Sequence, residues 1–210
     1  MTKIACFVGD FYHAEAMIAK ALEASAEGLD IELSFHKLVG LASVLSQKPR
    51  AILLSLENRL APNDDTDLVW LTDELDIALE AYVKEGGRLF VLHSALASFD
   101  FDSRYIQMLR GGFKHHPEKH CIVRYFSDEG AAAFAGHDFS IDDEHYHVEL
   151  LGNTNVFLHA ESLEHGRFIN GWYHDFGKGK VLCIAPTHTA EGYENPGLIK
   201  LLGEGLSFIK

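Results

Sequence analysis

The sequence predicts one α/β domain spanning residues 1–210, with a mainly parallel sheet between layers of helices. Three consecutive segments carry this prediction: an apolar strand at 51–56, an amphipathic helix at 67–84 and a second apolar strand at 88–92. Both strands are apolar at nearly every position, which is typical of strands covered on both faces of a parallel sheet. A helix between two such strands makes a right-handed crossover and leaves the strands parallel.

The N-terminal part follows the same pattern. Residues 4–8 form an apolar run that ends at Gly9-Asp10, which predicts a strand and its turn. Apolar residues at helical spacing predict a helix over 12–26. Residues 31–35 alternate like a strand. Strands and helices therefore alternate through most of the first half of the chain.

Two further helix predictions rest on the pattern of apolar residues and on end signals. In the segment 67–84, leucine and valine recur on one helical face, and Gly86-Gly87 supplies a stop signal. The final helix begins after Asn195, with Pro196 at its first position.

The second half is less regular. Strands are predicted at 121–126, 155–160 and 180–185, separated by loop-rich segments that contain most of the thirteen histidines. Residues 111–117 (GGFKHHP) are predicted to form a rigid loop. No linker, repeat or low-complexity tract divides the chain.

Composition narrows the class of protein. The formal net charge is −13 and no basic run occurs, which argues against nucleic acid and anionic membrane surfaces as partners. No apolar stretch reaches the roughly 20 residues of a membrane span. The three cysteines, Cys6, Cys121 and Cys183, lie in strand-like runs, so we expect reduced thiols and a cytoplasmic location. A homo-oligomer is left open.

Polar residues follow several strands at the edge where open parallel sheets bind ligands. These segments are Gly9-Asp10, Glu57-Asn58, His93-Ser94 and Thr187-His188. His93 follows a buried strand at a turn into small residues, a topology that presents a nucleophile in other folds. Because imidazole titrates near neutrality, His93 and His188 are predicted to be proton-transfer groups or metal ligands. No glycine-rich dinucleotide motif is present, so no nucleotide cofactor is expected.

Two histidine-rich segments offer further candidates. Adjacent histidines in an extended chain face opposite ways, so at most one of His115 and His116 is expected in a pocket, and we favour His116. In the segment 141–147 (IDDEHYH) the same alternation leaves two competing pairs. These pairs are Glu144 with Tyr146, and His145 with His147. Glu191 is a weaker candidate for the carboxylate that orients His188.

Four segments in this order resemble the ThuA-like (trehalose utilisation) family. They are 86–95 (GGRLFVLHSA), 105–117 (YIQMLRGGFKHHP), 139–146 (FSIDDEHY) and 171–188. The sequence departs from the family pattern at Arg88, where a third glycine is usual, and at 180–183 (KVLC). The resemblance implies a flavodoxin-like, class I glutamine amidotransferase-like α/β/α fold. It also implies metabolism of carbohydrates, specifically oxidised 3-keto glycosides.

In that superfamily the position of His93 normally carries the cysteine nucleophile, so glutamine amidotransferase activity is not implied. The main hypothesis is an enzyme for a small-molecule carbohydrate. The expected catalytic residues are His93, His188 and Glu144. The expected substrate-binding residues are Asp10, Ser94, Tyr146 and Trp172.

Two other hypotheses stay open. A divalent metal such as zinc is one, with a ligand set of His93, His116, His147 and His188, Glu144 being the alternative to His147. A non-catalytic sugar-binding or regulatory protein is the other.

Overall fold

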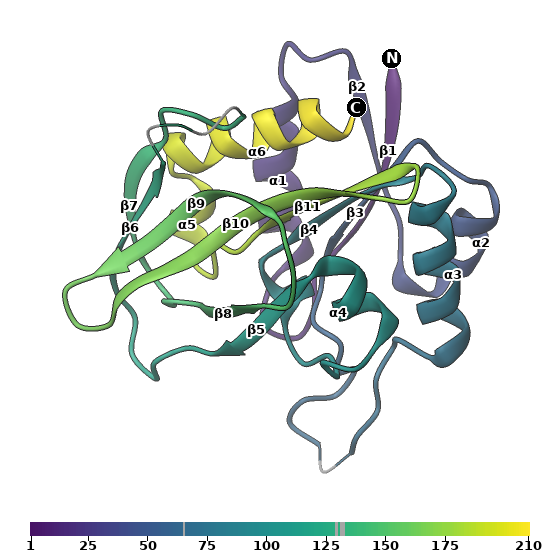
Figure 1. The fold of residues 1–210 in the computed structure, drawn as a ribbon, viewed down its shortest axis with the longest axis horizontal. Helices are drawn as coiled ribbons and strands as arrows, with labels where there is room; N and C mark the ends of the chain where they lie inside the picture. Colours follow the sequence, from purple (N-terminus) through teal and green to yellow (C-terminus); the bar gives the residue numbers. More distant parts are fainter. Residues whose placement is uncertain (65, 129, 131–132) are drawn as a thin grey trace.

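The computed structural model describes residues 1–64, 66–128, 130 and 133–210 (Figure 1). The helices are α1 (Glu15–Ala26), α2 (Leu41–Ser46), α3 (Asp73–Lys84), α4 (Arg104–Leu109), α5 (Ala190–Tyr193) and α6 (Pro196–Ile209), with short 3₁₀ helices η1 (Leu38–Gly40) and η2 (His93–Leu96). The strands are β1 (Thr2–Val8), β2 (Ile31–Phe35), β3 (Ala51–Ser55), β4 (Arg88–Leu92), β5 (Gly111–His115), β6 (Cys121–Ser127), β7 (Asp138–Asp143), β8 (His147–Leu150), β9 (Asn155–Ser162), β10 (Gly166–Phe176) and β11 (Gly179–Ile184).

A nine-stranded mixed sheet runs through both halves of the chain, in the order β2-β1-β3-β4-β11-β10-β9-β6-β7. The strands from β2 to β11 are mutually parallel. From β10 to β7 every pairing is antiparallel. The predicted mainly parallel sheet is therefore correct for the first part only. Between β5 and β11 the described residues form no crossover helix, and strands without such a crossover can pair antiparallel.

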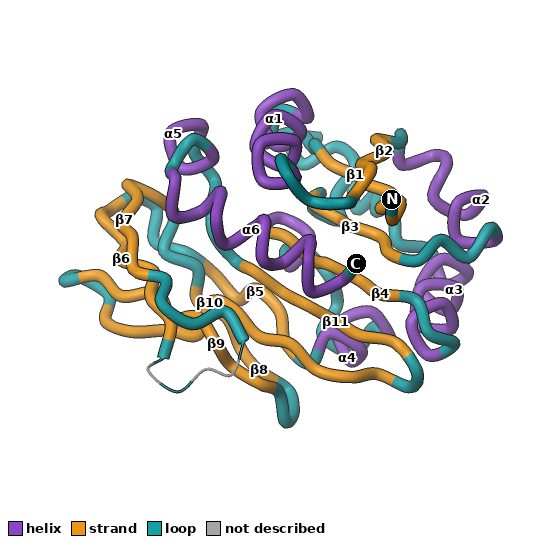
Figure 2. Tube along the Cα trace, turned by 90° about the horizontal axis from the view of Figure 1, so that it is seen from above, coloured by secondary structure: helices purple, strands orange, loops and turns teal. Residues whose placement is uncertain are grey.

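The buried strands pack helices on both faces because successive side chains point to opposite sides. Leu53 and Phe90 belong to the core under α1 and α6. Their neighbours Leu54 and Val91 belong to the core under α2, α3 and α4. Figure 2 shows α1 and α6 on one side of the sheet and α3 and α4 on the other. This arrangement explains why both strands are apolar throughout.

Helix α3 begins six residues later than the sequence predicts. Thr72 is its N-cap, and the side chain accepts a hydrogen bond from the amide of Leu75. Leu68 lies in the preceding loop, where its carbonyl accepts from the amide of Leu60 and its side chain is 58% exposed. The apolar stripe thus continued into a loop by coincidence of spacing.

Helix α1 also starts late, and this matters for the site. The carboxylate of Asp10 accepts hydrogen bonds from the amides of Tyr12 and His13. Asparagine and aspartate side chains commonly hold a turn in this way. The turn delays the helix to Glu15 and leaves His13 outside it.

The segment 111–117, predicted to be a loop, instead forms strand β5, which pairs with β8 in a separate two-stranded sheet. Glycine fits positions 111 and 112 because a Cβ would be crowded there. It would lie 2.7 Å from Leu150 at position 111 and 3.0 Å from Ile106 at position 112. Within the described residues, no helix has the length and apolar character of a membrane span.

Candidate active site

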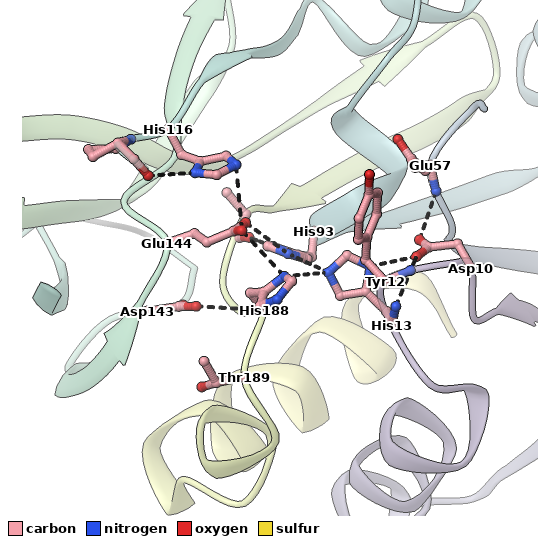
Figure 3. Close-up of polar contacts among 12 residues, drawn as sticks. Asp10, Tyr12, His13, Glu57, His93, His116, Asp143, Glu144, His188 and Thr189 are labelled. Atoms are coloured by element: carbon pink, nitrogen blue, oxygen red, sulfur yellow. Dashed lines mark hydrogen bonds and ion pairs between the residues drawn. The ribbon is translucent and has the colours of Figure 1, made fainter. Parts of the chain in front are cut away.

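Three histidines converge at the carboxyl ends of the parallel strands (Figure 3). His13 follows β1, His93 follows β4 and His188 follows β11. Nε2 of His13 lies 3.1 Å from Nε2 of His93 and 2.9 Å from Nδ1 of His188. This is the sheet edge where the sequence predicts a ligand site.

His93 occupies a turn with left-handed backbone conformation, φ 46°. That conformation costs a non-glycine residue about 1 kcal/mol. The ring is held on two sides: Nδ1 donates to the carbonyl of Ala185 at 2.7 Å, and Tyr146 stacks on it at a centroid distance of 4.4 Å. Burial lowers the pKa of His93 well below its ordinary value.

Asp10 positions His13. Its Oδ1 accepts from Nδ1 of His13 at 2.7 Å, and its Oδ2 accepts from the amide of Glu57 at 3.0 Å. Burial opposes ionisation of Asp10, but the hydrogen bond and charge of His13 outweigh it and lower the pKa of the carboxyl. Asp10 is absent from the cavity wall. The structure thus places Asp10 behind the cavity lining, with both of its oxygens engaged inside the protein.

His188 is placed by a buried carboxylate. Oδ1 of Asp143 accepts from the amide of His188 at 2.8 Å, and Oδ2 accepts from the hydroxyl of Tyr125 at 2.8 Å. Burial and the neighbouring His13 lower the pKa of His188 to about 4. Glu191 is exposed, so it is not the carboxylate beside His188.

Glu144 is the carboxylate that faces the ring of His188. Its Oε1 lies 3.5 Å from Nδ1 of His188 and 3.5 Å from Nε2 of His116. Its Oε2 lies 3.9 Å from Nε2 of His93. Burial raises the pKa of Glu144, which makes its carboxylate a stronger base. Glu144 therefore lies among three imidazole rings, and its own carboxylate can accept a proton.

A cavity of about 280 Å³ opens onto these groups. His13, His116 and His188 line it together with Glu144 and Tyr146. His93 does not, since it is 1% exposed and lies behind this lining. Of the three predicted catalytic residues, His188 and Glu144 line the cavity and His93 lies behind it.

The rest of the cavity wall carries a second carboxylate, Glu57. Its Oε2 accepts from Arg59 at 2.8 Å and from the hydroxyl of Ser98 at 2.8 Å. Its Oε1 is buried and has no hydrogen-bond partner. Ser94 is also among the lining residues. A ligand with hydroxyl groups that contacts Glu57 can donate a hydrogen bond to its Oε1.

Two predicted site residues lie elsewhere. Trp172 is fully buried in β10, and its Nε1 donates to the carbonyl of Leu109 at 2.8 Å. It packs in the core beneath α4 and is not among the residues that line the cavity. His147 stacks on Phe168 at 3.7 Å and is not part of the cluster around His13.

The two competing pairs of the segment 141–147 separate as alternation requires. Glu144 and Tyr146 line the cavity, whereas His145 and His147 lie near each other on the other side with a ring separation of 5.4 Å. His116 likewise lines the cavity, while its neighbour packs against His147.

Among the described residues, two groups have donor atoms close enough to hold a metal ion. One consists of His13, His93 and His188, and the other of His120, Glu144 and His188, with all donor atoms of each group within 4.8 Å of one another. Of the four ligands predicted from the sequence, only His93 and His188 occur together in one group.

Three features of the site were not predicted from the sequence: the participation of His13, the burial of Asp143 and the role of Glu57. His13 was assigned to a helix, although an aspartate three residues earlier at a strand end is the signal of a turn. Asp142 and Asp143 have the sequence of a solvent-exposed acidic turn. In the structure Asp143 is the last residue of β7, pairs with Cys121 and is fully buried.

A larger groove of about 900 Å³ lies between α2 and α3. Its described lining is mostly apolar and includes no histidine. The histidines and carboxylates described above thus belong to the smaller cavity.

Comparison with known proteins agrees with this picture of the fold. The family model ThuA, described as trehalose utilisation, matches residues 16–209. No curated protein has a sequence that matches the chain.

Solved structures are similar at low identity. A thua-like protein from Parabacteroides merdae has a TM-score of 0.72 at 13% identity, covering 99% of this chain and 89% of its own. A cytoplasmic protein from Salmonella typhimurium LT2 has a TM-score of 0.69 at 13% identity, with both chains fully covered. A beta-galactosidase from Rahnella sp. R3 has a TM-score of 0.68 at 11% identity, but only 31% of that chain is covered. At these identities the likeness concerns the fold alone.

Proposed function

Because this chain belongs to the ThuA (trehalose utilisation) family, we propose that it is an enzyme that acts on a 3-keto glycoside by proton transfer. The observation that carries the proposal is the position of Glu144, a buried carboxylate among imidazoles at a cavity of about 280 Å³. Oxidation of a sugar to a 3-ketone acidifies the hydrogen on the adjacent carbon, and a carboxylate base with a raised pKa suits its removal.

The reaction we propose is an elimination. Glu144 takes the proton from C2, and the electron pair of that C–H bond forms the C1–C2 double bond by way of the enolate of the C3 ketone. The bond from C1 to the glycosidic oxygen breaks, and this oxygen leaves with its electron pair. The proton passes from Glu144 to Nε2 of His116, which lies 3.5 Å away, and then to the leaving oxygen.

The backbone around His116 supports the relay. Its Nδ1 donates to the carbonyl of Pro117 at 2.7 Å, so Nε2 is free to accept a proton. Tyr146, which is 4% exposed, stacks on His93 and lines the cavity beside Glu144. Because His93 does not reach the cavity, we assign it no proton-transfer step.

We propose further that the scaffold is a flavodoxin-like, amidotransferase-like one. His93 stands after β4, in a left-handed turn, where an enzyme of that superfamily has its cysteine. The helices that pack on both faces of the sheet, each over its own hydrophobic core, support this placement.

The direct test is turnover of 3-keto-trehalose by the wild-type protein, with trehalose as the control substrate. We expect consumption of the oxidised sugar, release of glucose and no reaction of trehalose. In deuterated water we also expect exchange at the carbon beside the ketone. If folded protein neither consumes nor exchanges the oxidised sugar, the proposed elimination is wrong and a sugar-binding role is favoured.

Glu57→Gln should weaken substrate binding. A charged acceptor for a buried hydroxyl contributes about 1.5–3 kcal/mol, so we expect KM for the oxidised sugar to rise by about tenfold or more. We expect kcat to change little, because Glu57 is not among the groups around the base. Steady-state kinetics checks this, with the exposed Glu164→Gln as the matched control. Equal falls in kcat and kcat/KM would contradict a binding role.

A further inference from the structure

We propose that His13, His93 and His188 bind one divalent transition-metal ion. This inference goes beyond the proposed reaction and does not depend on the identity of the substrate. It rests on where the ring nitrogens of the three histidines are held and on what their hydrogen bonds leave free.

The hydrogen bonds fix the tautomers of two rings. Nδ1 of His93 faces the carbonyl of Ala185 at 2.7 Å, and a carbonyl only accepts, so this nitrogen carries the proton. Nδ1 of His13 faces the carboxylate of Asp10 at 2.7 Å and carries its proton for the same reason. In both neutral rings Nε2 is therefore a bare lone pair.

These two bare nitrogens lie 3.1 Å apart, and both rings are at least nine-tenths buried. Nδ1 of His188 lies 2.9 Å from the same nitrogen of His13. If Nδ1 of His188 carries a hydrogen, it can donate to Nε2 of His13. Nε2 of His93 is then left without a hydrogen-bond donor and faces the lone pair of His13. One cation at the common point satisfies all three nitrogens at once.

The spacing suits a first-row metal. Zinc–nitrogen bonds of about 2.0–2.1 Å in a tetrahedral site place ligand nitrogens roughly 3.3 Å apart. The distances from Nε2 of His13 to the nitrogens of His93 and His188 are slightly shorter than this value, and the three donor atoms all lie within 4.8 Å of one another. A small outward rotation of the rings is enough to admit the ion.

The groups behind the ligands are also those of a metal site. Metal-binding histidines usually donate their second N–H to a carboxylate or a backbone carbonyl, which orients the ring. Asp10 does this for His13, and the carbonyl of Ala185 does it for His93. Asp10 and His13 both precede the segment matched by the family model.

Three histidines leave a fourth position open, as in catalytic zinc sites. An ion there can polarise a carbonyl group in the cavity. Glu144 stands beside the ligands, 3.5 Å from Nδ1 of His188 and 3.9 Å from Nε2 of His93, and keeps its role as base.

The experiment uses full-length protein without a histidine tag, treated with a chelator and then titrated with Zn²⁺ by calorimetry. We expect one equivalent to bind the wild type. His13→Ala and His93→Ala should each lower the affinity by about 100-fold or more, and Asp10→Asn by about tenfold. Co²⁺ should give the ligand-field absorption of a tetrahedral site in the wild type and lose it in His13→Ala. Circular dichroism establishes that each variant is folded. If His13→Ala is not folded, His13→Gln is used in its place.

His147→Ala is the matched control, since that ring lies in a histidine cluster away from His13, and it should bind zinc like the wild type. Glu144→Gln should also retain zinc, so a failure of the proposed elimination can be told from a failure of the metal site. The metal proposal is overturned if the wild type binds no zinc, or if folded His13→Ala and His13→Gln bind it normally. It is also overturned if His120→Ala abolishes binding while His13→Ala does not.

Discussion

Glu144→Gln is expected to reduce kcat for 3-keto-trehalose by about a thousandfold, within the range that removal of a general base produces. Glutamine keeps the shape of the side chain and a hydrogen-bond acceptor, but it cannot take up the proton. Burial strengthens the native carboxylate as a base, whereas the amide of glutamine has no such basicity. Steady-state kinetics measures the loss, and deuterium exchange at C2 should fall in parallel.

The matched control is Glu149→Gln. That carboxylate is exposed on β8, five residues along the chain, and pairs with Lys114 away from the cavity. It should leave kcat and KM unchanged. If Glu144→Gln retains more than about a tenth of the wild-type kcat, the base is another residue. His188 is then the first to examine, because it also lines the cavity.

Trp172→Ala is expected to lower the free energy of unfolding by about 3–5 kcal/mol, the usual cost of removing a buried large aromatic side chain. The side chain is completely buried, and the truncation also removes the hydrogen bond from Nε1 to the carbonyl of Leu109. That carbonyl lies at the end of α4 and would be left without its partner. Urea unfolding followed by circular dichroism measures the change.

Two further variants separate stability from sugar binding. Leu163→Ala removes a fully exposed side chain in a hairpin and should have almost no effect on stability. Trp172→Phe should lose part of the stability but keep kcat and KM for the oxidised sugar. A large rise in KM in this folded variant would restore the sugar contact predicted from the sequence.

The parallel part of the sheet was predictable because the chain there alternates strands and helices with strong periodicity. The antiparallel part was not, since strands of mixed composition show neither a clear alternation nor the crossover helices that dictate direction. Helix starts were also missed. Thr72 caps α3, and Asp10 holds a turn before α1. In both cases the helical pattern of apolar residues begins before the true start of the helix.

For the site, local alternation was informative. It separated Glu144 and Tyr146 from His145 and His147, and it favoured His116 over its neighbour. Exposure was not predictable in the same way. His93, Asp10 and Trp172 were all expected at the site, yet His93 is buried behind the cavity lining, Asp10 is bonded to His13, and Trp172 fills the core.

The sequence by itself determined that polar groups gather after the buried strands, because strand ends and alternation are local properties of the chain. It determined that His93 and His188 come to the same edge, since parallel strands end together. Only the tertiary structure decided that His13 joins them, because that depends on Asp10 bonding across to the segment after β3. It also decided which of these groups face the cavity, since depth below a surface depends on packing between elements far apart in the chain.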